Sequence, residues 1–243
     1  KTHSQTLLPM LDEAARMIEL DPDTVDVIAV SGGPGSFTGL RIGSATAKGL
    51  GLALDKPLVH VPTVDALACN LWGSSGLICP LMDARRNQTY TGLYRFADRQ
   101  PEMTGAKSTD RQPEMTGAQC TDRQPGTAGA RYTDKRLEIV RPQCAVGIDE
   151  IIGDVNRLGE PVIFLGDGVS VFSLYIKENC QVPFSFAPAH MNRQRAGSVA
   201  WLGMQYAKEG KLESAADHRP DYLRASQAER ERRQRIAQTQ ADT

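Results

Sequence analysis

The sequence has few aromatic residues, no excess of either charge and no long apolar run. Phe, Trp and Tyr make up 6% of the 243 residues while 40% are hydrophobic, so a core must be built mainly from aliphatic side chains. The 28 Lys and Arg residues are balanced by 29 Asp and Glu residues, which leaves a formal net charge of −1. This balance excludes a histone-like or ribosomal type of nucleic-acid binder, because such proteins need an overall positive field.

The sequence also lacks the features of membrane, exported and disulfide-rich proteins. No segment approaches the ~20 apolar residues that a membrane helix needs, and no charged-then-apolar leader opens the chain. The five cysteines are irregularly spaced and never form Cys-x-x-Cys, unlike a disulfide framework or a structural zinc site. We therefore expect a soluble, cytoplasmic protein with reduced thiols.

Strand-like and helix-like patterns alternate along the chain, which is typical of the α/β class. An apolar stripe that includes Leu7, Leu8 and Leu11 predicts a first helix starting near Thr6, with Pro9 in its first turn. Strands are predicted at 25–30, 58–61, 77–82, 89–96, 137–140 and 161–165, and further helices at about 38–54, 64–71, 146–158, 170–179 and 193–208. The residues 83–87 should form the turn of a hairpin.

A glycine-rich segment, SGGPGSFTGLRIG at 31–43, connects a predicted strand to a predicted helix. Free backbone N–H groups and the helix dipole make such a turn a candidate anion or nucleotide site, here at Gly33, Gly35 and Ser36. The segment matches neither GxxxxGK[ST] nor GxGxxG, and Pro34 removes one N–H group. A tight turn without a ligand remains an equal alternative.

The helix after this turn carries small residues at every fourth position: Gly39, Gly43, Ala47 and Gly51. Each glycine inside a helix costs about 0.8–1 kcal/mol relative to alanine. We expect another helix to approach this smooth face closely enough to offset the cost. That second helix could belong to this chain or to a partner, and the sequence leaves both open.

Three copies of a twelve-residue unit that begins DRQP follow one another from 98 to 133. They contain no core that stacking could bury, so we expect a mobile insert within a hairpin; a repeat-binding role stays open. The tail after Tyr222 is rich in arginine, including Arg224 and Arg230, and its charges are partly offset by Glu229 and Glu231. This pattern is typical of a solvent-exposed helix face, and a contact of the tail with RNA phosphates stays open.

Side chains for catalysis or metal binding are sparse. The four histidines, His3, His60, His190 and His218, are far apart in sequence, and no two lie at i and i+4, so no metal site is predicted. Asp83 and Asp167 follow strands and could hold a ribose or a hydrated metal ion, although turn formation is the commoner role. We find no nucleophile with a convincing base and predict no catalytic residue.

Five segments carry a resemblance to a known family: SGGPGSFTGLRIG, AKGLGLAL, DARRNQTYTGLY, FLGDGV and PDYLRASQAER. In this order they resemble the bacterial TsaB family, non-catalytic partners in making N6-threonylcarbamoyladenosine at position 37 of tRNA. The resemblance implies an actin/Hsp70-like (ASKHA) fold of two lobes. Family members open with further strands, so we expect the amino-terminal strands of the first lobe to be missing from this sequence.

On this basis we divide the chain into three parts. Residues 1–75 would form the incomplete first ASKHA-like lobe, and 76–190 the second lobe with the repeat insert at 98–134. Residues 191–243 would form a return helix and a polar tail.

The resemblance also implies partners and a binding surface. The catalytic paralogue TsaD would pair with the first two helices as a heterodimer, a TsaE-like ATPase would join them, and tRNA would be reached only through the complex. The implied interface residues are Leu7, Leu8, Leu11, Phe37, Gly39, Leu40, Gly43 and Ala47.

The resemblance further implies no cofactor of the chain's own, with ATP or ADP a candidate ligand at the partner interface. TsaD holds a metal through two histidines at i and i+4, and Thr63 and Leu67 occupy the matching positions here. Because neither is a useful metal ligand, we predict an accessory subunit without catalysis. Two alternatives stay open: an ATP-dependent carbamoyl- or phosphoryl-transferase of the same superfold, and a homodimeric binding module.

Overall fold

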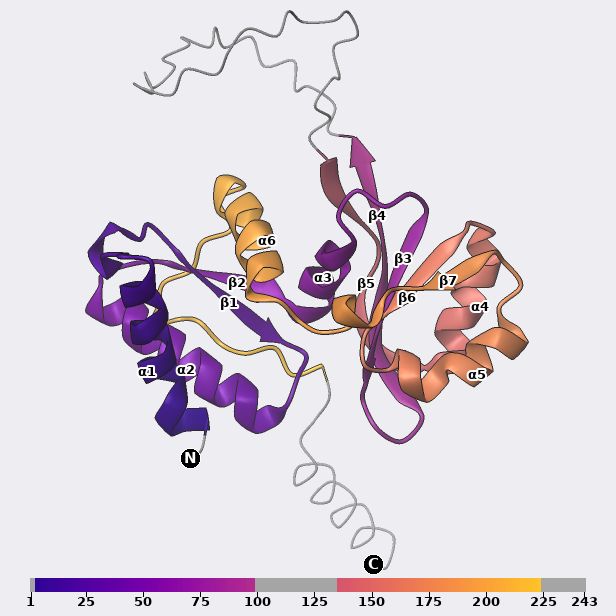
Figure 1. The fold of residues 1–243 in the computed structure, drawn as a ribbon, viewed down its shortest axis with the longest axis horizontal. Helices are drawn as coiled ribbons and strands as arrows, with labels where there is room; N and C mark the ends of the chain where they lie inside the picture. The colour runs from indigo at the N-terminus through magenta and orange to yellow at the C-terminus, as the bar shows by residue number, and fades with distance from the viewer. Residues whose placement is uncertain (1–2, 99–134, 224–243) are drawn as a thin grey trace, which may run out of the picture.

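Two β-sheets organise the structure (Figure 1), a computed structural model that describes residues 3–98 and 135–223. The first sheet has two parallel strands among these residues, β1 (Ile28–Gly33) and β2 (Leu58–Pro62). The helix α2 (Phe37–Ala53) connects them, so the glycine-rich segment lies in a β–α–β unit, as predicted.

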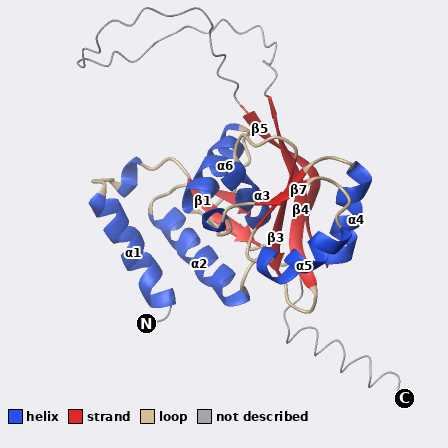
Figure 2. Ribbon diagram, turned by 45° about the vertical axis from the view of Figure 1, so that its right-hand side comes forward, coloured by secondary structure: helices blue, strands red, loops and turns tan. Residues whose placement is uncertain are grey.

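Helix α1 (His3–Met17) lies beside α2 on one side of this sheet (Figure 2). It begins before Thr6, so the prediction that Pro9 lies in the first turn is wrong: Pro9 is inside the helix. A proline there has no N–H to donate to the preceding turn, which weakens the helix locally. None of the residues of α1 is buried.

Two helices lie on the other side of the first sheet, α3 (Thr63–Ala68) and α6 (Ala196–Lys208). Gly203 of α6 lies against the backbone of β1, and a Cβ atom there would be 2.6 Å from that of Ala29. The last long helix of the described chain therefore returns to the first sheet.

The second sheet has the strand order β5-β4-β3-β6-β7. Its strands are β3 (Leu77–Asp83), β4 (Gln88–Asp98), β5 (Lys135–Gly147), β6 (Val162–Leu165) and β7 (Phe184–Phe186). The pairs β3–β4 and β4–β5 are antiparallel, and the pairs β3–β6 and β6–β7 are parallel. The predicted hairpin turn is confirmed, with Arg85, Arg86 and Asn87 all at positive φ.

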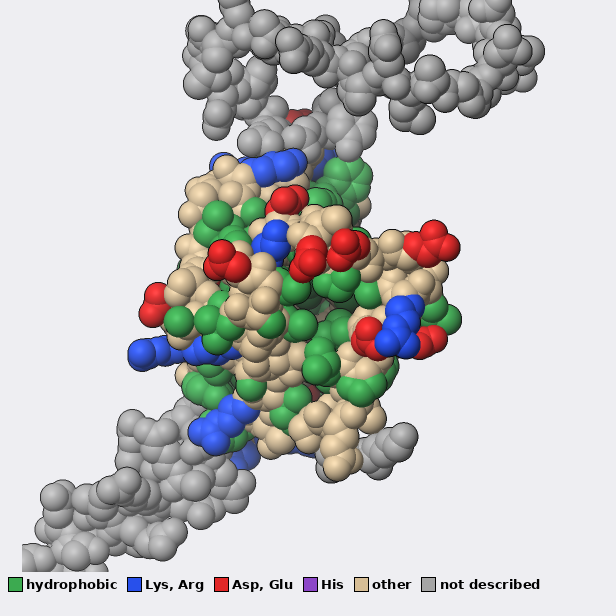
Figure 3. Space-filling view, turned by 90° about the vertical axis from the view of Figure 1, so that its left-hand side faces the viewer, with side chains coloured by type: hydrophobic (Ala, Val, Ile, Leu, Met, Phe, Trp, Pro, Cys, Tyr) green, Lys and Arg blue, Asp and Glu red, His purple; other side chains and the backbone are tan. Residues whose placement is uncertain are grey.

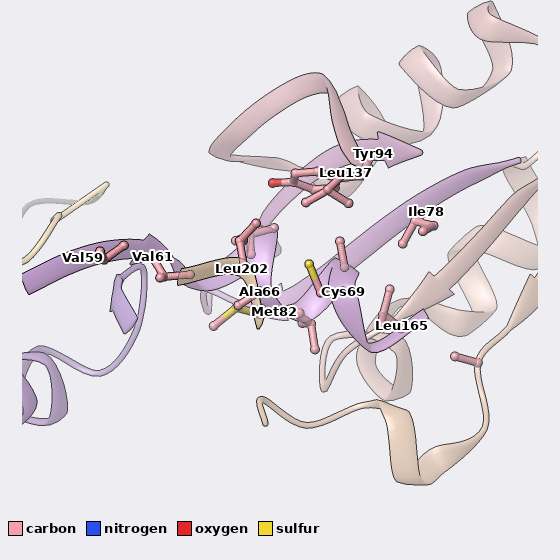
Figure 4. Close-up of a cluster of buried hydrophobic side chains, with 14 residues drawn as sticks. Val59, Val61, Ala66, Cys69, Ile78, Met82, Tyr94, Leu137, Leu165 and Leu202 are labelled. Carbon is pink, nitrogen blue, oxygen red and sulfur yellow. The ribbon is translucent and has the colours of Figure 1, made fainter. Parts of the chain in front are cut away.

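The two faces of the second sheet have separate cores because side chains alternate along each strand. Ile78 of β3 packs towards the first sheet in a cluster with Tyr94 of β4 and Leu202 of α6 (Figure 4). Leu77 and Leu81 of β3 point to the opposite face from Ile78. They pack against the two outer helices, α4 (Ile148–Leu158) and α5 (Val169–Asn179).

The predicted α/β class is confirmed by these alternating strands and helices. Asp98 and Lys135 pair directly across β4 and β5, so the strands that flank the predicted insert are antiparallel partners. The repeats beyond Asp98 and the arginine-rich tail lie outside the described residues. How the chain divides into lobes stays a prediction. Among the described residues, no helix is both long and apolar enough to cross a membrane.

Candidate partner-binding surface

The small-residue face of α2 divides into two halves with different surroundings. In the second half, a Cβ atom on Gly51 would lie 2.5 Å from Cδ1 of Leu58 and 2.7 Å from Cβ of Ala215. Ala47 is 6% exposed and belongs to the same small core, with Val30. Ala47 therefore packs inside the chain, and this corrects its assignment to a partner interface.

The first half of the same face is open. A Cβ atom on Gly43 would meet no atom within 4 Å, and one on Gly39 would approach only the side chain of Ser36, at 3.5 Å. No described part of this chain packs closely enough on Gly43 to require a glycine. Its conformational cost of about 0.8–1 kcal/mol is therefore not offset within the chain.

Helix α1 adds exposed leucines beside this open half. Leu8 is 52% exposed and Leu11 is 44% exposed, whereas Leu7 is partly buried. Figure 3 views this side of the molecule: hydrophobic side chains gather over its middle and lower part, and charged side chains lie across its upper part and at its edges. Large exposed leucines on neighbouring helices mark a surface that can bury apolar area against another molecule.

An aromatic pair lies at the start of α2. The rings of Phe37 and Tyr222 are 5.0 Å apart between centroids, and the guanidinium carbon of Arg41 lies 4.0 Å from the centroid of Phe37. Phe37 is 39% and Tyr222 40% exposed. Sequence reasoning missed Tyr222 as a surface residue, although the PDYL motif that contains it carried part of the family resemblance.

We use the name α1–α2 face for this surface. Its members are exposed or partly exposed in the described chain: Leu7, Leu8, Leu11, Phe37, Gly39, Leu40, Gly43 and Tyr222. All but Tyr222 were predicted from the sequence to contact a partner; whether they do is taken up below.

Helix α2 contains no acidic residue, and its two basic side chains are engaged. Lys48 donates hydrogen bonds to the backbone carbonyls of Ala216 and His218, at 2.7 and 3.2 Å. Arg41 lies over Phe37. A partner that covers the α1–α2 face therefore needs apolar contacts more than compensating charge.

The glycine turn before α2 is closely packed by the chain itself. A Cβ atom on Gly33 would lie 2.2 Å from the backbone oxygen of Asp221, and the N–H of Asp221 donates to the carbonyl of Gly32 at 2.6 Å. The Ser36 oxygen accepts from the N–H of Gly39 at 3.2 Å as the helix cap. Gly35 is partly exposed. An anion at this turn stays a prediction. The Ser36 hydroxyl oxygen already accepts a hydrogen bond as the helix cap.

The positions that resemble the metal ligands of the catalytic family do not fit a metal. The hydroxyl of Thr63 shares a hydrogen bond of 2.7 Å with that of Ser31. The side chain of Leu67 is fully buried among apolar neighbours. Thr63 is the first residue of α3, which follows Pro62 and has no side-chain capping bond.

Between these two positions lies a buried carboxylate, Asp65, which is 3% exposed. Its two oxygens accept hydrogen bonds from the hydroxyls of Tyr94, at 2.7 Å, and Tyr206, at 3.2 Å. Burial raises the pKa of Asp65 above its ordinary value, and the two tyrosine hydrogen bonds act in the opposite direction. The pKa of Tyr94 is raised by burial and by the nearby carboxylate.

Asp83 is the last residue of β3, and Asp167, which follows β6, lies next to it. The N–H of Asp83 donates to Oδ1 of Asp167 at 3.2 Å, and Oδ1 of Asp83 accepts from the N–H of Arg85 at 2.8 Å. Arg193 lies 3.9 Å from Asp167. The carboxylate of Asp83 therefore has the turn role that the sequence made the commoner alternative, whereas that of Asp167 bonds across to β3.

The structure also brings together two histidines that the sequence left apart. The rings of His60 and His218 are 5.8 Å apart between centroids, and Nδ1 of His218 is 2.5 Å from Oε1 of Glu213. Burial lowers the pKa of His60. No sequence signal could find this cluster, because it depends on the segment after α6 folding back onto β2.

Comparisons with known proteins agree with the resemblance drawn from the sequence. The family model described as "TsaD: tRNA N6-adenosine threonylcarbamoyltransferase" matches residues 1–232. A protein named tRNA threonylcarbamoyladenosine biosynthesis protein TsaB from Bacillus subtilis is 29% identical over 94% of this chain and 82% of its own length. The protein of the same name from Haemophilus influenzae is 36% identical over 37% of this chain and 39% of its own.

Shorter matches reach the catalytic family. A tRNA N6-adenosine threonylcarbamoyltransferase from Protochlamydia amoebophila is 39% identical over 27% of this chain and 19% of its own length. Two solved structures from Pseudomonas aeruginosa, titled YeaZ and a protein with similarity to peptidase YeaZ, give a TM-score of 0.62 each. They are 21% and 20% identical, cover 90% and 92% of this chain, and are each covered over 85% of their length. The predicted ASKHA-type α/β fold is confirmed.

Proposed function

The chain belongs to the TsaD family and groups with its TsaB members, and from this premise we propose that it binds and activates a TsaD-like catalytic paralogue. The protein takes part in the biosynthesis of N6-threonylcarbamoyladenosine in tRNA. In the proposed complex it is an accessory subunit: the paralogue carries out the transfer, and this chain supplies a binding surface.

The open first half of the small-residue face of α2 is the observation that carries the proposal. Gly43 has no neighbour within 4 Å of where a Cβ would be, while Gly51, two turns further along the same helix, is tightly packed by its own chain. Each glycine lowers helix stability by a similar amount. A helix of another molecule lying across Gly39 and Gly43 would offset the cost at the open end, as β2 does at the closed end.

The exposed side chains around this glycine pair fit the same role. Leu8 and Leu11 project from α1, a helix in which no residue is buried. A helix with no buried side chain gains little from packing in the isolated chain, and tertiary packing supplies most helix stability in proteins. Burial of both leucines by a partner would stabilise α1 as well as the complex.

Two positions support the accessory rather than the catalytic role. Where the catalytic relatives are expected to have a pair of metal-binding histidines, this chain has Thr63 hydrogen-bonded to Ser31 and Leu67 packed in the core. Neither side chain fits a catalytic metal, because a leucine has no ligand atom and the threonine hydroxyl already has a partner.

Activation by such a subunit requires a difference in binding. If the paralogue exists in an active and an inactive conformation, the chain activates it only by binding the active one more tightly. Coupling of this kind commonly amounts to about 5–150-fold. The proposal extends to the other components: a TsaE-like ATPase and tRNA join through the paralogue, and ATP or ADP, where present, lies at the interface.

A reconstituted transfer assay tests the proposal. The TsaD-like paralogue is incubated with tRNA, a threonylcarbamoyl donor and the ATPase, with or without an equimolar amount of this chain. We expect product formation to rise at least about 5-fold with the chain and to be absent when the paralogue is omitted. An unchanged rate would contradict activation, and product from this chain alone would favour the transferase alternative.

A homodimer is a second candidate, favoured by the same exposed leucines. Light scattering separates the two: the accessory role predicts that the paralogue displaces any self-association at equimolar concentration. Self-association that persists in an excess of the paralogue would support the homodimeric module.

A further inference from the structure

Three ligand-type side chains lie together where the segment after α6 meets β2. One nitrogen of His60, one nitrogen of His218 and one oxygen of Glu213 all lie within 4.8 Å of one another. His60 comes from β2, and the other two come from the segment that follows α6. The backbone of Glu213 bonds to that of Leu58 in both directions, at 2.9 Å, which fixes this segment on β2.

His218 is oriented and incompletely satisfied. Its side chain is fully buried, and its Nδ1 atom is 2.5 Å from Oε1 of Glu213. Its other ring nitrogen, Nε2, is buried without any hydrogen-bond partner. Buried polar atoms almost always have a partner in native proteins, so a bare Nε2 beside a second histidine indicates that a ligand is expected there.

His60 supplies the second nitrogen and the access. It is only partly buried, so an ion can reach the cluster from solvent at this side. Its ring lies flat against the backbone of β1: a Cβ atom on Gly32 would be 2.0 Å from Cε1 of His60. The glycine thus makes room for the ring, which explains its presence within a strand.

We propose that His60, Glu213 and His218 form a binding site for one divalent transition-metal ion, with Zn²⁺ the best match. Two imidazoles and one carboxylate are a ligand set that Zn²⁺ binds readily. A carboxylate that holds one nitrogen of a histidine while the other faces the metal is also the usual support of zinc-binding histidines. As observed, Oε1 of Glu213 holds Nδ1 of His218 and so has the supporting role; the carboxylate becomes the third ligand when its side chain turns towards the ion.

The bound ion would join two parts of the chain that are far apart in sequence. It would link His60 of β2 to His218 in the segment after α6. Three residues after His218, the N–H of Asp221 donates a hydrogen bond to the carbonyl of Gly32. Tyr222, which stacks on Phe37, follows directly. The proposed role is structural: the ion holds this segment against the first sheet. The inference does not depend on the accessory function.

Metal titration of the full chain tests the site directly. The protein is stripped with a chelator, dialysed and titrated with Co²⁺ and with Zn²⁺, using visible absorption and isothermal titration calorimetry. We expect one ion per chain, a Co²⁺ spectrum typical of nitrogen and oxygen ligands, and a melting temperature that rises by several degrees with Zn²⁺.

Single substitutions locate the ion. His60→Gln changes a partly exposed ligand and should lower the affinity by more than about 100-fold while leaving the melting temperature of the metal-free protein nearly unchanged. His218→Gln should abolish binding as well, and its fold is checked by circular dichroism. His190→Gln, at an exposed histidine of a short 3-10 helix, is the matched control and should bind as the parent does.

Three results would overturn the site. The first is no binding to the unsubstituted chain. The second is equal affinity in the His60→Gln and parent proteins, which would move the ion elsewhere. The third is a Co²⁺ spectrum with sulfur-ligand bands, which would assign the ion to cysteines instead of this cluster.

Discussion

The hydroxyl of Tyr94 lies 2.7 Å from Oδ1 of Asp65 and donates to it in a fully buried setting. Tyr94 belongs to β4 of the second sheet, and Asp65 to α3, which follows the first sheet. Tyr206 of α6 donates to the other oxygen of the same carboxylate. One buried carboxylate therefore connects three elements across the junction of the two sheets. Tyr94 itself belongs to the buried cluster drawn in Figure 4.

Removing the hydroxyl of Tyr94 should destabilise the protein. Tyr94→Phe keeps the ring in the core but leaves Oδ1 of Asp65 without this donor, which should lower the free energy of unfolding by about 1–3 kcal/mol. Urea unfolding measures the change. Tyr222→Phe, on a tyrosine that is 40% exposed, is the control and should change it by less than about 0.5 kcal/mol. Equal effects of the two substitutions would contradict the importance of the buried bond.

The raised pKa of Asp65 predicts a specific pH dependence. Its pKa lies above the ordinary value of 3.8 in the folded chain because burial disfavours the charged form. Between these two values the folded state binds more protons than the unfolded state, so the Asp65 contribution to stability decreases as pH rises through the window. The free energy of unfolding of the parent, relative to Asp65→Asn, should therefore fall with rising pH and then level off.

Urea melts of the parent and Asp65→Asn from pH 4 to pH 8 measure this difference, since the variant lacks only that titration. A difference that does not change with pH would mean that the carboxylate titrates alike in both states. A difference that increases with pH would mean a lowered pKa, contrary to the buried setting.

Alanine substitutions in the two halves of the small-residue face of α2 should change the free energy of unfolding in opposite directions. Gly43→Ala adds a methyl group in open space and removes the helix penalty of glycine, so the free energy of unfolding should rise by about 0.5–1 kcal/mol. Gly51→Ala forces a methyl group against Leu58 and Ala215 and should lower it by about 1–3 kcal/mol. Thermal and urea unfolding of both variants decide this; a loss at Gly43 would show that it is packed within the chain.

Charge on the α1–α2 face should weaken pairing with the TsaD-like paralogue. Leu8→Asp and Leu11→Asp place carboxylates on exposed positions of α1, so the isolated chain should tolerate them. We expect each to raise the dissociation constant at least about 10-fold, the effect of losing about 1.4 kcal/mol. Leu174→Asp, on an exposed leucine of α5 under the second sheet, is the matched control and should pair normally.

The sequence was sufficient to predict the local elements that depend on short-range patterns. The glycine segment at 31–43 correctly predicted a turn into a helix, because a strand-to-helix turn needs those residues. The strand before it was predicted at 25–30, whereas β1 begins at Ile28 and continues to Gly33. The hairpin turn at 83–87 was predicted because it separates two adjacent strand-like segments. In the structure, three consecutive residues of this tight turn have positive φ values. The start of α1 was missed because Pro9 suggested a helix boundary that the chain does not have.

Features that depend on distant segments could not be predicted. Gly43 and Gly51 look alike in the sequence, and only the return of Ala215 to α2 separates the open half from the closed one. The same returning segment brings His218 to His60 and Tyr222 to Phe37. Hydrophobic periodicity describes one helix or strand at a time, whereas these contacts depend on how the segment after α6 packs against the first sheet and α2.

The dissociation constant between this chain and the TsaD-like paralogue, measured for the parent and for Gly43→Leu by isothermal titration calorimetry, tests the central claim most directly. A Cβ atom at this position meets no atom of the chain within 4 Å, so a leucine side chain would start into open space. The account predicts that Gly43→Leu folds and is at least as stable as the parent, because the helix penalty of glycine is removed, but binds at least about 100-fold more weakly, a loss of about 2.7 kcal/mol. Parent-like affinity of a well-folded Gly43→Leu protein would contradict it.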